Sequence, residues 1–283
     1  MASPTAPPSG GLTSMTATTA TATAFAALHT PAAPLALANA WDVASARLVE
    51  AAGARAVATT SAGVAWSLGS PDGDALARDR ALDLVARVAA AVSVPVTADI
   101  EGGFATDPAG VGETVTGVLA AGAVGINIED GTRTPADHAD RIAAARAAAE
   151  AAGVPLFINA RVDTYLFGLG EPHTRLDETL ARAAAYLRAG ASGIFVPGVT
   201  DPATIAELAK GIDAPFNVLV GPGAPTVAEL GALGAARVSL GSGVAEAAYA
   251  VVRRATEELL TSGTYGTLSG SLPYGELNAL LKG

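Results

Sequence analysis

One phrase recurs along the chain: a helix-forming stretch that ends in Ala-Gly or Leu-Gly, followed at once by a short apolar strand. It reads EAAGARAVATT, LAAGAVGINIED, EAAGVPLFINAR, LRAGASGIFVPG and GALGAARVSLGSG. The glycine of each copy stands where a helix often ends with a residue of positive φ, a conformation that glycine adopts without steric cost. The phrase therefore predicts regular alternation of helices and strands. These glycines are Gly53, Gly122, Gly153, Gly190 and Gly234.

Three more strands complete the pattern. Two of them enter through proline, in AVSVPVTAD and IDAPFNVLV, and PLALANAWD supplies the first strand. The strands are apolar throughout rather than alternating, which indicates burial on both faces and hence a parallel sheet. The predicted strands are Leu35–Asn39, Ala56–Thr60, Val96–Asp99, Gly125–Glu129, Phe157–Arg161, Gly193–Val196, Phe216–Leu219 and Arg237–Leu240.

Eight β/α units fit a closed (β/α)8 TIM barrel of the α/β class. An open doubly wound sheet is the alternative, but it usually carries a Gly-rich phosphate loop after its first strand. Here that position reads NAWDVAS, which favours the barrel. After the last strand, a helical pattern over residues 244–260 is followed by the turn-rich stretch TSGTYGTLSGSLPYG and a short terminal helix.

The first 24 residues differ from the rest of the chain. They are rich in Ala, Thr, Pro, Ser and Gly and carry no charged side chain. Without a basic n-region or an apolar h-region they make a poor signal peptide, so we expect a disordered leader and a cytoplasmic protein. Residues 25–283 are then one barrel domain that includes the C-terminal helical tail.

Composition excludes several classes of function. The net charge is −10, from 27 acidic against 17 basic residues, and the lysines are Lys210 and Lys282, so we expect no nucleic-acid partner. The absence of cysteine excludes disulfides, thiolate metal sites and thiol nucleophiles. No apolar run approaches the roughly 18 residues of a membrane span, so no membrane partner is expected either.

Carboxylates gather where the strands end. Asp99 and Glu101 follow the third strand, Glu129 ends the fourth, and Asp72 lies in the loop after the second. The C-terminal ends of the strands form the active-site face of a barrel, where these acids would repel one another without a cation among them. Oxygen ligands alone favour a hard cation, Mg²⁺ or Mn²⁺. For Asp72, as for Asp42, the alternative role is that of a helix N-cap or turn residue.

Arg161 ends the apolar strand FINAR, so its guanidinium is expected in the barrel mouth. It could pair structurally with Glu129 or Asp163. Otherwise it binds an anionic substrate or stabilises a developing enolate. No predicted strand contains a lysine, which excludes a Schiff-base aldolase on this fold.

Small and polar residues supply the other candidate contacts. Ser61, Ala62 and Gly63 follow the second strand and offer backbone N–H groups as a carboxylate cradle. Trp41 and Asn217, at the ends of the first and seventh strands, are further candidates for substrate binding.

Two side chains are candidate proton donors, and two histidines are not. His173 lies in the loop GLGEPHTRLD after the fifth strand and could reach the mouth, and Tyr165 begins the same loop. His29 precedes the barrel and His138 lies at the polar start of a helix, so both are expected on the surface.

The combination of NAWDVASARLVEAAG, TTSAGVAWSLGSPDGD, PVTADIEGGFA, GAVGINIEDG and INARVD resembles the isocitrate lyase/phosphoenolpyruvate mutase superfamily, and within it the small bacterial 2-methylisocitrate lyase-like branch. The resemblance covers nearly all of residues 25–282. It implies a barrel that binds Mg²⁺ and a 2-oxo acid or its enolate. In such families the last helix commonly swaps between subunits, which implies a homodimer or homotetramer.

The resemblance also implies a division of labour among the site residues. Asp99 would be the direct metal ligand, and Asp72, Glu101 and Glu129 would hold metal-bound waters. Arg161 would contact the carboxylate or oxo group of the substrate, and the residues around Ser61 would bind the carboxylate.

The chain departs from the family at one loop. Lyases of the superfamily carry a Lys/Arg-Cys-Gly-His motif after the strand-four acid, whose cysteine protonates the departing product, and mutases carry a loop with Lys and Asn. This chain has GTRTPADHADRI there, without Cys or Lys. Cleavage of isocitrate or 2-methylisocitrate by the usual acid is therefore doubtful, and so is phosphonate mutase activity.

The residues together predict a Mg²⁺-dependent carbon–carbon lyase that acts on a small 2-oxo or 2-hydroxy di-acid through a metal-bound enolate. Oxaloacetate decarboxylation is one version, because CO₂ leaves without help from an acid, and the enolate could then take a proton from water, Tyr165 or His173. Two alternatives stay open. One is an enzyme acting on a P–C bond of the phosphonopyruvate type, and the other is a barrel that binds an oxo acid without turnover.

Overall fold

The computed structural model describes residues 10–282, with side chains from residue 18 onward. Its strands form one parallel sheet in the order β1-β9-β8-β7-β6-β5-β4-β3-β2. The strands are β1 (Leu35–Leu37), β2 (Asn39–Ala40), β3 (Val57–Thr59), β4 (Val96–Asp99), β5 (Gly125–Glu129), β6 (Phe157–Arg161), β7 (Gly193–Val196), β8 (Phe216–Leu219) and β9 (Arg237–Ser239).

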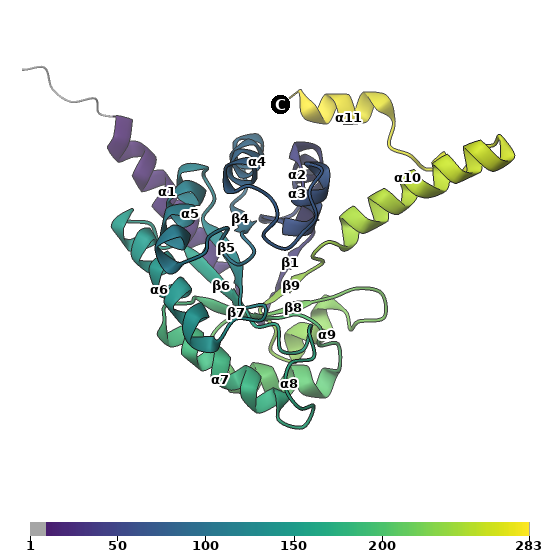
Figure 1. Ribbon diagram of the computed structural model, residues 1–283. Coiled ribbons are helices and arrows are strands. Elements are labelled where there is room, and N and C mark those ends of the chain that lie inside the picture. Colours follow the sequence, from purple (N-terminus) through teal and green to yellow (C-terminus); the bar gives the residue numbers. More distant parts are fainter. Residues whose placement is uncertain (1–9, 283) are drawn as a thin grey trace, which may run out of the picture.

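The first predicted strand closes the sheet into a barrel. β1 and β2 are two parts of that strand, separated by Ala38 alone. Leu35 of β1 pairs with Arg237 of β9, whereas Asn39 of β2 pairs with Ala58 of β3. The nine strands therefore fill eight positions around a ring, which confirms the (β/α)8 barrel (Figure 1).

Helices alternate with the strands and surround the barrel (Figure 1). Three of them, α5, α6 and α8, begin with proline directly after an Asp or Thr N-cap, a favourable helix start. The helices are α1 (Gly10–Ala27), α2 (Val43–Ala51), α3 (Ser61–Ser67), α4 (Arg78–Ala91), α5 (Pro108–Ala120), α6 (Pro135–Ala151), α7 (Arg175–Arg188), α8 (Pro202–Gly211), α9 (Val227–Ala232), α10 (Gly243–Ser262) and α11 (Tyr274–Leu281), with a 3₁₀ turn at Gly266–Leu268.

The repeated glycines have the conformation that their positions predict. All five follow a helix and have φ between +66° and +110°. Each allows the chain to leave its helix and enter the next strand within a few residues, which explains the short phrase that recurs in the sequence. The core inside and around the barrel is built largely of Ala, Val and Ile.

Helix α1 corrects the expectation of a disordered leader. Residues 10–24 belong to this helix, and residues 1–9 lie outside the described part of the chain. Ala22 and Phe25 are completely buried, and they pack with Val124 and Phe157 at the N-terminal ends of the strands. The prediction failed because it rested on the composition of residues 1–24 and on their lack of charge, whereas Ala22 and the adjoining Phe25 anchor the helix over the bottom of the barrel.

Two histidines expected on the surface are buried. His29 is 6% exposed, its Nδ1 lies 3.0 Å from the carbonyl oxygen of Phe25, and its ring stacks on Phe157 at 3.9 Å between centroids. His138 is fully buried against Tyr186 of α7. Burial, reinforced by neighbouring arginines, lowers the pKa of His29 to about 4 and that of His138 to about 3. Both side chains therefore act as neutral core residues.

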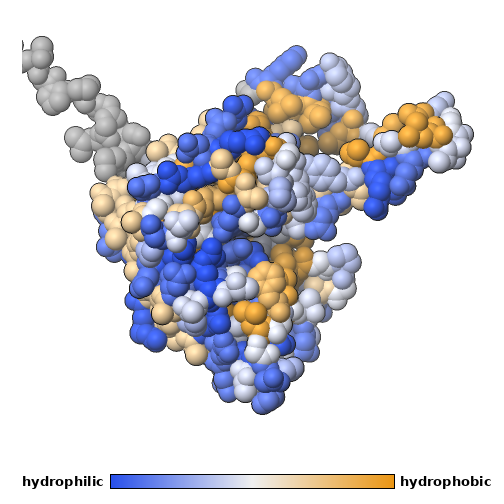
Figure 2. Space-filling view, in the orientation of Figure 1, coloured by the Kyte–Doolittle hydropathy of each residue, from blue (hydrophilic) through white to orange (hydrophobic). Residues whose placement is uncertain are grey.

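The chain leaves the barrel after β9. Helix α10 projects away from it and carries exposed apolar side chains along its length, as Figures 1 and 2 show. Helix α11 returns and lies near α2. Within residues 10–282, no helix combines the length and apolarity needed to cross a lipid bilayer.

The packing of α1 leads to a stability prediction. Phe25→Ala removes a fully buried ring from the bottom of the barrel and should lower the free energy of unfolding by about 3–5 kcal/mol, measured by urea denaturation. Thr23→Ala alters an exposed side chain of the same helix, whose hydroxyl bonds only to the backbone of Thr19, and should have little effect. Equal stabilities of the two variants would show that α1 does not hold the barrel.

Candidate active site

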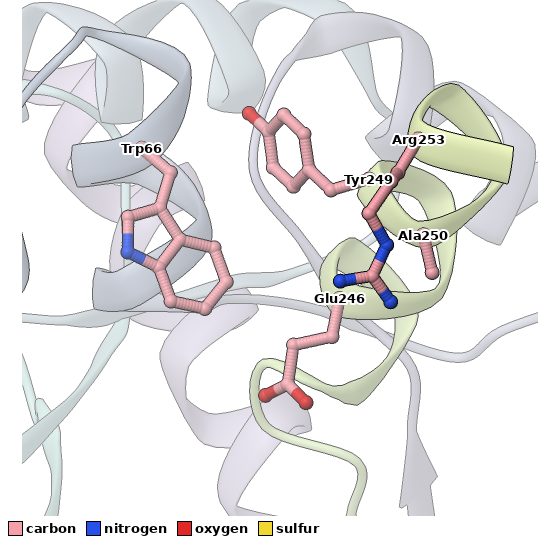
Figure 3. A pocket seen from close by; sticks show the side chains of 5 residues that line it. All are labelled: Trp66, Glu246, Tyr249, Ala250 and Arg253. Carbon is pink, nitrogen blue, oxygen red and sulfur yellow. The ribbon is translucent and has the colours of Figure 1, made fainter. Parts of the chain in front are cut away.

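A cavity of about 220 Å³ opens at the C-terminal ends of the strands. Acidic, basic, amide and hydroxyl side chains converge on it from several strands and the loops that follow them. Its lining includes Asn39, Ser61, Asp72, Asp99, Asn127, Arg161, Pro197, Ser239 and Ser242. A larger hollow of about 500 Å³ lies between α3 and α10 and is lined by Trp66, Glu246, Tyr249, Ala250 and Arg253, none of which lies at the end of a strand (Figure 3). The smaller cavity is therefore the candidate active site.

Two of the predicted carboxylates, Asp72 and Asp99, line this cavity, and Glu101 and Glu129 lie within electrostatic reach of both without forming its wall. Asp99 lies at the end of β4, and Asp72 faces it from the loop after α3. Burial raises the pKa of Asp99, and Asp72 adds repulsion, while the guanidinium of Arg161 acts in the opposite direction. The same repulsion reaches Glu101 and Glu129, so the four acids act on one another as one group.

Glu101 is held in an unusual backbone conformation. Its φ is +51°, in the left-handed region, and its side chain is 2% exposed. One carboxylate oxygen accepts a hydrogen bond from the backbone N–H of Asp74, and the other has no partner among the described residues. Burial, with repulsion from Asp72, Asp74 and Asp99, raises the pKa of Glu101 to about 7. A carboxylate in this position lacks a positive partner.

Arg161 is the cation at the centre of the cluster. Its Nη1 lies 2.5 Å from Glu129 Oε2, and its Nε donates to Asp163 Oδ1 at 2.6 Å. The structural pairing considered from the sequence is therefore present, and Arg161 also lines the cavity, whereas its contact with a substrate stays a prediction. Burial alone would lower the pKa of Arg161, but Glu129, Asp163 and Asp99 raise it above its ordinary value. The guanidinium therefore stays charged.

Even with this partner, Glu129 keeps a high proton affinity. Burial raises the pKa of Glu129 to about 8. The attraction of Arg161 lowers this pKa and repulsion from Asp99 and Asp163 raises it further, so the attraction does not cancel the effect of burial. Arg161 pairs with more than one acid at once, so full ionisation of the cluster would leave an excess of negative charge.

A buried network supports Arg161 from behind. Asp163 accepts a hydrogen bond from the N–H of Gly131 at 3.1 Å, and its own N–H donates to Asp130. Asp130 in turn receives Arg182 Nη1 at 2.9 Å and the hydroxyl of Tyr186 at 2.7 Å. The sequence analysis considered the pairing of Arg161 with Asp163 but not the further contacts of Asp130, which directly follows the strand-end residue Glu129.

The donor set fits a hard cation. Every acid of the cluster offers oxygen ligands, and the excess negative charge and the unpartnered oxygen of Glu101 call for a positive partner. Within the part of the chain that the structure describes, no three His, Cys, Asp or Glu side chains converge closely enough to hold a metal directly. One direct ligand, Asp99, with the other acids acting through water, stays a prediction.

The small residues after β3 divide into two roles. Ser61 and Ala62 line the cavity, as predicted. Gly63 does not, because it packs so tightly that an added Cβ would lie 2.8 Å from the side chains of Thr60 and Trp41. Trp41 likewise packs in the apolar cluster around Val64 and is not part of the cavity wall.

Other predicted residues lie apart from the cavity. His173 is exposed on its loop, and Tyr165 is half-buried with its ring 5.8 Å from the guanidinium carbon of Arg175. Asn217 is buried beneath the site, where its amide bonds to neighbouring strands. Asp42 caps α2 by accepting a hydrogen bond from the N–H of Ser45 at 2.7 Å, which is the alternative considered for it.

The floor of the cavity contains a residue that was not selected from the sequence. Asn127 of β5 lines the cavity, and beneath it lies Arg237 of β9, which is 1% exposed. The signal was present in the strands GINIE and RVS, where a polar residue interrupts an apolar run. An inward-facing polar side chain in a barrel strand points to the site or to a partner that satisfies it.

The raised carboxyl pKa values predict how stability depends on pH. In the folded, metal-free protein Glu101 and Glu129 bind protons more tightly than in the unfolded chain, where glutamate ionises near pH 4.5. Their stabilising contribution is complete below that pH and is lost as the pH rises to about 8, so the free energy of unfolding should fall across this window. Glu129→Gln should flatten the decline.

Thermal unfolding from about pH 4.5 to about pH 8.5 in EDTA measures this effect. Glu207→Gln, at an exposed position of α8, should follow the wild-type curve. Parallel curves for Glu129→Gln and the wild type would contradict the raised pKa of Glu129.

Comparison with known proteins finds a matching family and several similar chains. Residues 25–260 match the family model described as phosphoenolpyruvate phosphomutase. An uncharacterised protein of Mycobacterium tuberculosis is 39% identical over 91% of this chain and 95% of its own. The crystal structure of a candidate lyase/mutase from Burkholderia cenocepacia J2315 has 40% identity and a TM-score of 0.85, over 93% of this chain and 95% of its own.

A relative with a named activity shares much of the chain. Oxaloacetate decarboxylase 2 of Pseudomonas fluorescens is 33% identical over 71% of this chain and 70% of its own. The barrel, the acids at its mouth and the family match lead to one conclusion: the chain belongs to the phosphoenolpyruvate phosphomutase family, within the isocitrate lyase/phosphoenolpyruvate mutase superfamily.

Proposed function

We propose that the protein is a Mg²⁺-dependent lyase that removes CO₂ from a small 2-oxo di-acid of the oxaloacetate type. The observation that carries this proposal is Arg161, a partly buried guanidinium that lines the cavity and pairs with two acids. A substrate with two carboxylates complements the arginine, and the acids complement a cation that would accompany that substrate.

The size of the cavity supports a small substrate. Drug-sized ligands occupy pockets of about 300–1,000 Å³, and this cavity, at about 220 Å³, is below that range. Ser61 and Ala62 follow β3, whereas Arg161 ends β6, which lies three positions away in the sheet. The two carboxylate ends of a di-acid could therefore be bound from different sides of the mouth.

Decarboxylation agrees with the residues that the chain has and lacks. The bond between the carboxylate carbon and its neighbour breaks, CO₂ leaves, and the electron pair stays as an enolate that takes one proton to give the product. A divalent cation would lower the energy of that enolate by withdrawing charge from its oxygen. Arg161 adds a fixed positive charge in a site of low dielectric constant.

The loop after β5 provides no acid for a larger leaving group. It reads GTRT, and its arginine, Arg133, donates to Asp74 Oδ2 at 3.1 Å. CO₂ needs no proton to depart, so this loop does not obstruct decarboxylation. The named decarboxylase among the relatives supports the same choice.

The alternative of a P–C bond enzyme has less support. A phosphoryl group would require several cationic contacts, and of the residues described along the cavity wall Arg161 is the basic one. A barrel that binds an oxo acid without turnover is the remaining alternative, and the same experiment tests it.

Pyruvate release from oxaloacetate, with Mg²⁺ and with EDTA, tests the function. The wild type should release pyruvate in a metal-dependent manner, and Asp99→Ala should lose at least about 10³-fold in kcat/KM, equivalent to several kcal/mol. Because Asp99→Ala removes one of several repelling charges, it should fold with little loss of stability.

Asp42→Asn keeps the N-cap of α2 and should keep the full metal response. If 2-methylisocitrate or phosphonopyruvate yields pyruvate and oxaloacetate does not, the assignment of CO₂ as the leaving group is wrong. Oxalate binding without pyruvate from any substrate would favour a binding protein.

We also propose that the protein assembles as a homodimer or homotetramer. In a complete barrel the helix after the last strand closes the outer ring, but here α10 leaves and an apolar groove of about 590 Å³ lies between α2 and α9. Exposed side chains of α10, among them Val252, Leu259 and Leu260, need an apolar partner. The α10 helix of a second copy fits this requirement.

Sedimentation measures the assembly. Val252→Glu on α10 and Leu240→Glu in the groove each place a charge in the proposed contact and should shift the protein toward monomer. Glu207→Lys, on the exposed face of α8, should sediment as the wild type does. A wild type that is monomeric at micromolar concentration would refute the proposal.

A further inference from the structure

Asn127 occupies the floor of the candidate active site. It lies in β5 directly opposite Asp99 of β4 on one side and Asn159 of β6 on the other. The side chain is 5% exposed and lines the cavity, so its small accessible surface faces the space where a substrate would bind.

The orientation of the Asn127 carboxamide is determined by its neighbours. Its Oδ1 accepts from Asn159 Nδ2 at 2.9 Å and from Arg237 Nη2 at 3.2 Å. A guanidinium only donates, so the group that faces Arg237 must be the carboxamide oxygen and not its nitrogen. The NH₂ group is therefore on the other side.

That NH₂ group has no acceptor in the part of the chain that the structure describes. No hydrogen bond from Asn127 Nδ2 is formed there, yet the nitrogen is not among the buried polar atoms left without a partner. It is thus accessible from the cavity. The floor of the cavity therefore presents the Asn127 NH₂ group as a hydrogen-bond donor, held in a fixed orientation and without an acceptor among the described residues.

The burial of Arg237 lowers the stability of the fold, which argues that this residue has a role other than packing. The guanidinium is 1% exposed, and its Nε and Nη1 have no partner among the described residues. It forms no ion pair in the same part of the chain, although Asp99 attracts it from a distance. A buried, unpaired charge lowers stability, and packing alone would favour an apolar residue at this position.

We propose that Asn127 is a substrate-binding residue, whose carboxamide NH₂ donates to a carbonyl or carboxylate oxygen of the bound oxo acid, and that Arg237 is a positioning residue that holds the carboxamide in this orientation. The proposal rests on the proposed function, because it takes the ligand to be an oxo acid bound in the same cavity. According to this proposal, the substrate contacts Asn127 on the floor of the cavity in addition to Arg161 on its wall.

Two substitutions at Asn127 separate binding from folding. Asn127→Asp keeps the oxygen that Asn159 and Arg237 require and replaces the donor NH₂ with an acceptor, so it should fold at least as well as the wild type. Asn127→Ala removes the donor without adding a charge. The probe is oxalate, a planar dianion that imitates the enolate of a 2-oxo acid.

Oxalate affinity is measured by titration calorimetry in the presence of Mg²⁺, and thermal unfolding is recorded for each variant. We expect Asn127→Ala to bind oxalate about 10- to 100-fold more weakly than the wild type, and Asn127→Asp to bind it more weakly still, because its carboxylate repels the dianion. The melting temperature of Asn127→Asp should not fall.

The other outcomes are distinguishable. Unchanged oxalate affinity in Asn127→Ala, whatever its melting temperature, would show that Asn127 is purely structural and overturn the proposal. A wild type that binds oxalate but releases no pyruvate from oxaloacetate would contradict the proposed function alone. No oxalate binding by the wild type would overturn both.

Discussion

The chemistry of this barrel depends on the sharing of one arginine among several acids. Arg161 pairs with Glu129 and Asp163 at the same time, at 2.5 Å and 2.6 Å, while Asp99 remains within electrostatic reach. The attraction is strong because these groups are largely removed from water. It is also insufficient, since Glu101 and Glu129 retain pKa values of about 7 and about 8. A site balanced in this way favours the binding of a further positive charge.

The fold supports this balance from two directions. From behind, Asp130, Arg182 and Tyr186 hold Asp163, and through it the side chain of Arg161. From below, hydrogen bonds among the amides of Asn127, Asn159 and Asn217 connect β5, β6 and β8 inside the barrel. Such networks cost free energy unless every group is satisfied, so they are maintained where precise orientation matters more than stability.

Most of the barrel could be predicted from the sequence because its signals are local. A glycine after five of the helices, a proline before two of the strands and a continuous apolar strand are properties of a few adjacent residues, and β4 to β8 begin and end where the pattern indicates. The acids at the strand ends were predictable for the same reason, since parallel strands bring their C-terminal ends to one face.

The errors concern contacts between distant segments. Whether α1 packs depends on Phe25 meeting Phe157, 132 positions later in the chain (157 − 25), which no local pattern reveals. The same is true of His29, His138 and Asn217, whose surroundings come from other helices and strands. Asn127 and Arg237 were not selected as site residues because two polar residues on separate strands come into contact only when the barrel brings them together.

The departure of α10 from the barrel has a consequence for how the protein behaves on dilution. Because the groove between α2 and α9 is apolar, a copy without a partner exposes surface that a folded domain normally buries. If association covers that surface, folding and association become linked equilibria, and the midpoint of thermal unfolding rises with protein concentration. The cavity at the ends of the strands, where α10 begins beside Ser242, would then depend on that same concentration.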